Sequence, residues 1–206
     1  MSNSKINHFL IHYKGNKRNE TPLIINHIDF NNKKNIVEPF TGSSAMSFGI
    51  WKIYKDQFSA SQSVGTSSGF NYYLNDIDEK LIEVYHLFKT KSIEEIEENV
   101  NRVRLEVLQQ TDKKAFHKSI FQNNRDIYDY IYVNKYCMYG MSHLCLINTD
   151  KWKNEDRLKK IYKLTPLQRE FVSFIKSPNV FITNNDFKTI YEEHKNNPFR
   201  PSLCKY

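Results

Sequence analysis

Residues 35–50 read Asn-Ile-Val-Glu-Pro-Phe-Thr-Gly-Ser-Ser-Ala-Met-Ser-Phe-Gly-Ile, and this stretch decides the fold. A short apolar run ends at Glu38, a turn follows through Pro39 and Gly42, and small and apolar residues then recur at helical spacing. This order predicts a strand, a tight loop and a helix, the junction at which open α/β sheets bind nucleotide-like ligands. An ordinary strand–turn–helix connection is the alternative, because the three-glycine fingerprint and the Gly-Lys-Ser/Thr phosphate loop are both absent.

Two further strands are predicted to end near polar residues. The apolar stretch before Leu74-Asn75-Asp76 ends in an acid, which can accept both ribose hydroxyls of a bound nucleoside. Val180-Phe181-Ile182 is the third predicted strand, and Asp186 and Phe187 follow it. We therefore expect an α/β fold with a parallel sheet.

The order of these motifs resembles the Dam-type (alpha-group) site-specific DNA N6-adenine methyltransferases. The resemblance begins at Tyr13-Lys14-Gly15-Asn16-Lys17 and continues through the Glu38 junction and Asp76. Residues 131–141 are similar to the family's Leu-Asn-Arg-x-Cys-Phe-Asn-Gly-Leu segment, and residues 186–187 to its Asp-Phe pair. The resemblance implies a partial Rossmann-like methyltransferase sheet with an inserted helical subdomain. It also implies methyl transfer from S-adenosylmethionine to adenine N6 in double-stranded DNA.

The resemblance assigns the site residues. Contacts to S-adenosylmethionine are implied for Tyr13, Lys17, Glu38, Phe40, Gly42, Asp76, Asp186 and Phe187. DNA contacts are implied for Asn134, Lys135 and Tyr139. Two of these depart from the family, because Lys135 replaces its usual Arg and Tyr139 replaces its usual Asn. Beyond Met141 the family's Gly-x-Phe-Asn-x-Pro-Phe-Gly hairpin is not found, so no recognition sequence is predicted.

The catalytic loop of the family, Asp-Pro-Pro-Tyr, occurs nowhere in the 206 residues. In the family this loop holds the exocyclic amine of a flipped adenine for methyl transfer. No catalytic residue is therefore predicted, and we expect an inactive, truncated or frameshifted form in which the C-terminal strands of the sheet are missing. The domains expected are residues 1–90 and 177–206 for the methyltransferase part and 91–176 for the helical, target-recognising part.

A hypothesis for the missing loop comes from the genetic code. The codons TTT AGA CCC TCC CTA TGT AAA TAT encode residues 199–206. Read one base later, the same bases encode Leu-Asp-Pro-Pro-Tyr-Val-Asn. The hypothesis is a frameshift within this stretch, and coincidence through a free choice of synonymous codons is the alternative.

Composition favours a polyanionic partner. The chain has 30 Lys and Arg against 23 Asp and Glu, a net charge of +7, so nucleic acid is the expected partner and an ordinary basic surface the alternative.

The cysteines Cys137, Cys145 and Cys204 lack Cys-x-x-Cys spacing, which predicts neither a disulfide framework nor a metal site. Without a signal peptide or an apolar membrane span, we expect a soluble cytoplasmic protein.

Local signals predict helices and one loop. Helices are expected over residues 45–54, 79–88 and 151–163, after a capping box at Ser92 and after Thr165-Pro166; Thr21 is expected to cap a further helix. The Ser- and Gly-rich stretch over residues 59–69 predicts a disordered loop without chemistry.

Two functional alternatives stay open: a noncatalytic DNA-binding remnant or regulatory partner, and a pseudogene product without function.

Overall fold

The computed structural model describes residues 10–11, 17, 19–30, 34–60, 69–123, 125–136 and 159–195. The chain divides into two compact units. The sheet unit comprises residues 16–85 and 174–206, and the helical unit comprises residues 1–15 and 86–173. The three domain ranges expected from the sequence stay a prediction.

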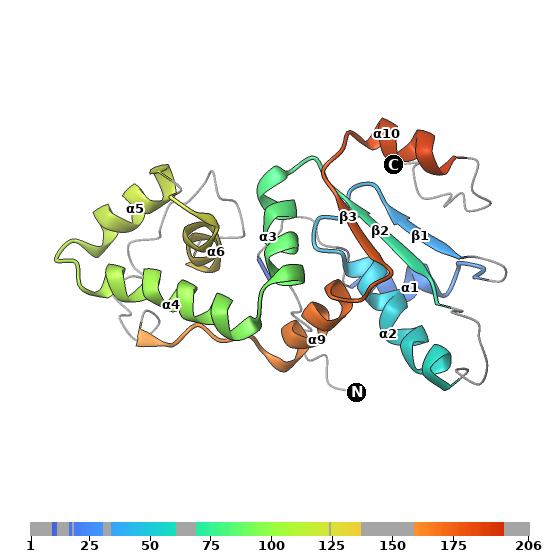
Figure 1. Cartoon of the computed structure of the whole chain (residues 1–206), viewed down its shortest axis with the longest axis horizontal. Coiled ribbons are helices and arrows are strands. Elements are labelled where there is room, and N and C mark those ends of the chain that lie inside the picture. The colour runs from blue at the N-terminus through green and yellow to red at the C-terminus, as the bar shows by residue number, and fades with distance from the viewer. Residues whose placement is uncertain are drawn as a thin grey trace. The chain divides into compact units, whose positions relative to one another are not determined.

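Three parallel strands form the sheet of the first unit. β1 (Asn35–Glu38), β2 (Asn71–Asn75) and β3 (Val180–Thr183) are hydrogen-bonded in the order β1-β2-β3 (Figure 1). Glu38 pairs with Leu74, and Leu74 in turn with Ile182, so the three strands end at the same edge. The predicted mixed α/β fold with a parallel sheet is confirmed at this level.

Alternation along β2 separates the two faces of the sheet. Tyr72 and Leu74 are 2% and 0% exposed and share one face of the sheet. α1 (Thr21–Ile25) and α2 (Ala45–Ala60) lie on one side of the sheet (Figure 1), and this is the side of Tyr72, because the Phe174 ring that meets it also lies 5.9 Å from the ring of Phe48 in α2. The ring of Tyr72 meets that of Phe174 edge-on, with centroids 5.1 Å apart. Burial of such aromatic and aliphatic side chains is the main source of stability on this face.

The opposite face is covered by α10 (Phe187–His194) (Figure 1). Tyr73 stacks on Phe181 of β3 with ring centroids 5.0 Å apart, and its ring lies 4.4 Å from that of His194. No helix was predicted over these residues. Asp186 begins it, because its carboxylate accepts a hydrogen bond from the N–H of Lys188 at 2.8 Å.

α1 packs closely on α2 at Gly49. A Cβ added to Gly49 would lie 2.5 Å from Cγ2 of Thr21 and 3.3 Å from Cδ1 of Ile25. The predicted capping role of Thr21 is wrong. Glu20 occupies the N-cap position, and the Thr21 hydroxyl instead donates to the carbonyl of Lys17 at 2.8 Å.

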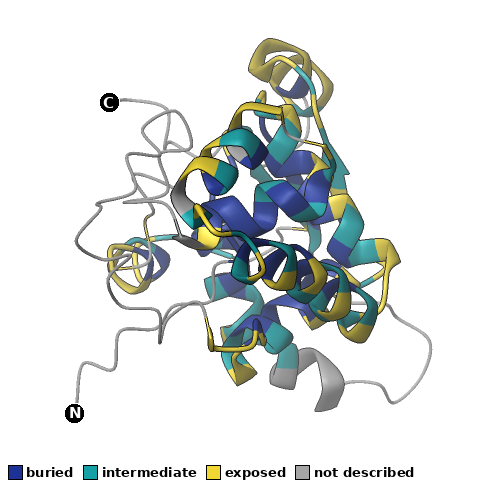
Figure 2. Ribbon diagram, turned by 90° about the vertical axis from the view of Figure 1, so that its left-hand side faces the viewer, coloured by how far each residue is buried: buried dark blue, intermediate teal, exposed yellow. Residues whose placement is uncertain are grey.

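The helical unit contains α4 (Ile93–Leu108), α5 (Lys113–Asn123) and α6 (Ile127–Tyr136); α3 (Glu79–Thr90) and α9 (Pro166–Ile175) contain residues of both units. The predicted cap of α4 is confirmed, because the Ser92 hydroxyl accepts from the N–H of Glu95 at 3.1 Å. The helices are buried along one side and exposed along the other (Figure 2). On α4 the buried side consists of Ile96, Val100, Val103, Arg104 and Val107.

The start of α9 forms the predicted capping box. The Thr165 hydroxyl accepts from the N–H of Gln168 at 3.3 Å, and the Gln168 side chain accepts from the N–H of Thr165 at 3.0 Å. Two predicted boundaries are wrong. α2 continues to Ala60, past the expected start of the loop, and residues 161–163 are not helical because Asn101 binds the backbone of Tyr162 at both N–H and C=O.

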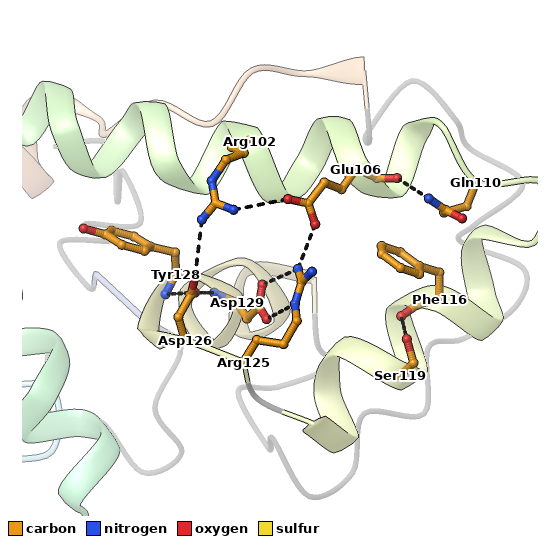
Figure 3. A network of polar contacts seen from close by, with 9 residues as sticks. All are labelled: Arg102, Glu106, Gln110, Phe116, Ser119, Arg125, Asp126, Tyr128 and Asp129. Carbon is orange, nitrogen blue, oxygen red and sulfur yellow. Dashed lines mark hydrogen bonds and ion pairs between the residues drawn. The ribbon is translucent and has the colours of Figure 1, made fainter.

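Ion pairs join α4 to α6 (Figure 3). The carboxylate of Asp129 is fully buried and accepts from Nε and Nη2 of Arg125 at 2.8 and 2.9 Å. Arg125 also binds Glu106 at 2.8 Å, and Arg102 bridges Glu106 and Asp126 at 3.2 and 3.4 Å. The network fixes the end of α4 against the start of α6.

Within the described ranges, no helix combines the length and apolar character that a bilayer span requires.

Candidate functional site

The loop between β1 and α2 is held in a tight, partly left-handed conformation. Gly42 has φ 45° and Ser44 has φ 52°, a conformation that glycine adopts freely and serine adopts at a cost. The N–H of Ser44 donates to the carbonyl of Thr41 at 2.6 Å, and the hydroxyl groups of the two side chains are also 2.6 Å apart. Ser44 is fully buried, so the surrounding contacts maintain the strained backbone.

Asp76, at the end of β2, binds this loop directly. Its Oδ2 accepts from the N–H of Gly42 at 2.9 Å, and its Oδ1 accepts from the N–H of Asp78 at 3.1 Å. An ionised carboxylate has about four acceptor sites. Two of them accept the backbone N–H groups of Gly42 and Asp78.

Glu38, at the end of β1, faces the first turn of α2. Its Oε2 accepts from the N–H of Ser47 at 3.3 Å, so the acid fills the anion-binding position at this helix start. Burial raises the pKa of Glu38 from 4.5 to about 7, and hydrogen bonds from Ser47, Met46 and Thr41 oppose that rise. A nearby cation would favour the ionised form of this carboxyl group.

Tyr85 of α3 supports the loop from the protein interior. Its hydroxyl donates to the carbonyl of Gly42 at 2.5 Å, and the Ser44 hydroxyl donates to the Tyr85 oxygen at 3.4 Å. From the sequence, Tyr85 is simply one residue of the helix predicted over residues 79–88. Since its partners lie 43 and 41 residues away, no local pattern reveals this role.

Two aromatic rings lie beside the strand ends. Phe40, after β1, and Phe187, after β3, have ring centroids 5.3 Å apart. Both rings are accessible, with 62% and 44% of each residue exposed. Exposed aromatic faces beside carboxylates suit a flat heterocycle with polar edges.

The structure brings together one group of the predicted residues. The carboxyl ends of the three strands carry Glu38, Phe40, Gly42, Asp76, Asp186 and Phe187, all in the sheet unit. Lys17 belongs to the same unit, where its exposed ammonium pairs with Glu20 at 3.0 Å. Tyr13 and Tyr139 lie outside the described residues. In the helical unit, Asn134 is 1% exposed and Lys135 is exposed.

Comparison with protein families identifies the chain. Residues 13–199 match the family model described as D12 class N6 adenine-specific DNA methyltransferase. The chain belongs to this family. A comparison with curated proteins finds no match. The resemblance to DNA N6-adenine methyltransferases is thereby confirmed, and the enzymes of this family depend on S-adenosylmethionine and methylate adenine in DNA.

The side chains of this D12 class methyltransferase suit that cofactor. S-adenosylmethionine combines hydroxyl groups and an adenine ring with a cationic sulfonium, and the strand ends offer carboxylate oxygens and exposed rings for these groups. Among the described residues, no cluster of three or more His, Cys, Asp or Glu side chains could hold a metal ion.

Proposed function

We propose that this methyltransferase binds S-adenosylmethionine at the carboxyl ends of β1, β2 and β3. The observation that supports the proposal is that six of the eight predicted cofactor residues lie at these strand ends, while Asp76 and Tyr85 hold the Gly42 loop. Ligands of open parallel sheets bind at this edge of the strands. When bound, the cofactor supplies a methyl group on a positively charged sulfur.

Each side chain has a defined role in this proposal. The two acceptor sites left on Asp76 receive ribose hydroxyl groups, and Phe40 and Phe187 contact the adenine ring. Asp186 lies next to Phe187 in the sequence, and its carboxylate accepts a hydrogen bond from the amino group of the cofactor's adenine. Glu38 contributes negative charge near the cationic part of the cofactor, which lowers its pKa toward the ordinary value.

We also propose that these 206 residues do not transfer the methyl group by themselves. The Asp-Pro-Pro-Tyr sequence that would hold the target amine is absent from the printed chain. Residues 199–206, for which one choice of codons would encode Asp-Pro-Pro-Tyr in the shifted frame, lie outside the described residues. Sequencing the gene tests the frameshift: codons other than those that encode Asp-Pro-Pro-Tyr in the shifted frame would refute it.

Calorimetry with S-adenosylhomocysteine tests the cofactor site. Asp186→Asn keeps a residue that caps α10 equally well but removes the carboxylate charge. We expect it to weaken binding by about tenfold, equivalent to one charged hydrogen bond. Asp112→Asn is the matched control, since Asp112 caps α5 by accepting from the N–H of Ala115 at 2.9 Å. Equal affinities of the two variants would contradict the role of Asp186.

A second pair of variants tests the aromatic contact. Phe187→Ala removes a ring next to the proposed adenine position, and Tyr191→Ala removes an exposed ring, 55% accessible, from the same helix. We expect only Phe187→Ala to weaken binding, by about tenfold, because one lost ring–base contact costs about 1–3 kcal/mol. Similar losses for both variants would indicate general damage to α10 instead.

Turnover and DNA binding are measured separately. Labelled cofactor and an adenine-containing duplex should give no labelled DNA, and labelling above background would refute the proposed inactivity. The net charge of +7 supports a second candidate, DNA binding without turnover. In that case affinity falls steeply with salt, and Lys135→Ala lowers the salt slope by about one. Lys113→Ala in α5 is the control.

A further inference from the structure

The side-chain amide of Asn75 has a complete set of hydrogen bonds. Nδ2 donates to the carbonyls of Pro39 and Asn185 at 3.1 and 2.9 Å. Oδ1 accepts from the hydroxyl of Thr183 at 2.8 Å and from the N–H of Asn185 at 2.9 Å. Asn75 is only 1% exposed, and both donors and both acceptor sites of the amide are used.

These bonds join the segments that follow all three strands. Asn75 is the last residue of the central strand β2, Pro39 follows β1, and Asn185 follows β3. The main chain reinforces the connection, because the N–H of Thr41 donates to the carbonyl of Asn75 at 2.7 Å. On the other side, the Asn184 side chain donates to the carbonyl of Asp76 at 2.7 Å.

We propose that Asn75 is a positioning residue that sets the separation of the β1 and β3 loops so that one cofactor molecule contacts both. The inference rests on the proposed cofactor site, since Phe40 lies on the first loop and Asp186 and Phe187 follow the second. Asn75 acts through these loops and is given no contact with the ligand.

Only an amide satisfies these four partners. Aspartate would turn two donors into acceptors that face the carbonyl groups of Pro39 and Asn185, and leucine would leave every partner without its bond. Asn75→Asp therefore removes the hydrogen bonds that hold the β1 and β3 loops to Asn75, while it changes the side-chain volume very little. Asn75→Ala, which leaves space for water, is the second variant if Asn75→Asp does not fold.

Asn101 of the helical unit provides the matched control. Its amide donates to the carbonyls of Glu97 and Tyr162 at 2.7 and 2.9 Å, and it accepts from the Tyr162 N–H and from Arg104 at 2.8 and 3.0 Å. Asn101→Asp thus removes the same two amide donors, again opposite two carbonyl groups, in the unit without the sheet.

The experiment asks whether Asn75 acts through the loop residues that contact the ligand. Calorimetry gives the affinity of S-adenosylhomocysteine for the wild-type chain, Asn75→Asp, Phe187→Ala and the double variant. We expect Asn75→Asp to weaken binding by about tenfold or more, because small misplacements of binding groups are costly. In the double variant it should add little to the loss caused by Phe187→Ala, because the two residues act on the same contact. Asn101→Asp should leave the affinity unchanged. Equal losses for Asn75→Asp and Asn101→Asp, or losses of Asn75→Asp and Phe187→Ala that simply add, would overturn the proposal.

Hydrogen exchange gives a test without ligand. The side-chain NH₂ of Asn75 should exchange slowly in the wild-type chain, and Asn75→Asp or Asn75→Ala should accelerate exchange at the N–H groups of both Thr41 and Asn185. Acceleration at one loop alone would overturn the positioning role. If exchange behaves as expected but the wild-type chain does not bind S-adenosylhomocysteine, the proposed cofactor site fails and the link between the loops stands.

Discussion

At the residue scale, two carboxylates at neighbouring strand ends differ because their surroundings differ. Asp76 accepts N–H groups with both oxygens, which ties the Gly42 loop and the start of α3 to the end of β2. Glu38 faces a helix start, yet the cost of burial outweighs the hydrogen bonds it accepts and raises its pKa to about 7. The same chemical group therefore holds backbone N–H groups at one strand end and has a raised pKa at the next.

The pKa of Glu38 predicts how stability depends on pH. The folded chain holds this proton up to about pH 7, whereas the unfolded chain releases it near 4.5. The contribution of Glu38 to the free energy of unfolding therefore falls by up to about 3 kcal/mol as pH rises from 4.5 to 7. Above pH 7 this contribution is constant. Chemical denaturation of Glu38→Gln and wild type across this range measures it.

The comparison with Glu38→Gln is needed because His117 acts in the opposite direction. Burial lowers the pKa of His117 from 6.5 to about 4, so its contribution to stability falls as pH drops through that range. We expect the stability difference, Glu38→Gln minus wild type, to increase from pH 4.5 to 7. A difference that is flat with pH would show that Glu38 titrates normally.

At the element scale, Gly49 determines how closely α1 approaches α2. Gly49→Ala adds a methyl group 2.5 Å from Thr21 in a packed contact, and we expect a loss of about 1–3 kcal/mol. Gly69→Ala is the control, since its methyl group would meet only Asn179 at 3.4 Å, and a change within about 0.5 kcal/mol is expected. Urea denaturation measures both, and equal losses would contradict the helix contact.

The ion-pair network at α6 predicts unequal effects for its two arginines (Figure 3). Arg125→Ala leaves the fully buried Asp129 carboxylate without its bidentate partner, and we expect a loss of about 2–3 kcal/mol. Arg102→Ala breaks pairs in which the arginine is 51% exposed, for which under about 1 kcal/mol is expected. Thermal denaturation of both variants tests this order, and a reversed order would refute it.

At the scale of the whole molecule, the division into two units predicts which segments a bound ligand protects from hydrogen exchange. S-adenosylhomocysteine at about 100 times its Kd should stabilise the binding region by about 2.7 kcal/mol. We expect slower amide exchange over residues 38–44, 75–78 and 184–190 and little change over α4, α5 and α6. Hydrogen exchange with mass spectrometry measures this, and protection concentrated in α4–α6 would place the ligand elsewhere.

The sequence predicted features that depend on neighbouring residues. The capping residues Ser92 and Thr165 and the strand that ends at Glu38 were all recognisable, because their hydrogen bonds and side-chain alternation span only a few positions. Predictions failed where local signals competed with packing. The hydroxyl of Thr21 could cap a helix, but Thr21 is the first residue inside α1 and packs its methyl group against Gly49 of α2.

By itself, the sequence determined the parallel strands, their polar ends and the resemblance to DNA N6-adenine methyltransferases, since each is recorded in short ordered motifs. Only the tertiary structure decided that Asn75 joins the strand ends, that Tyr85 holds the Gly42 loop and that the pKa of Glu38 rises to about 7. The partners of Asn75 are up to 110 residues away and that of Tyr85 is 43 residues away. The pKa of Glu38 depends on how completely the fold excludes water from it.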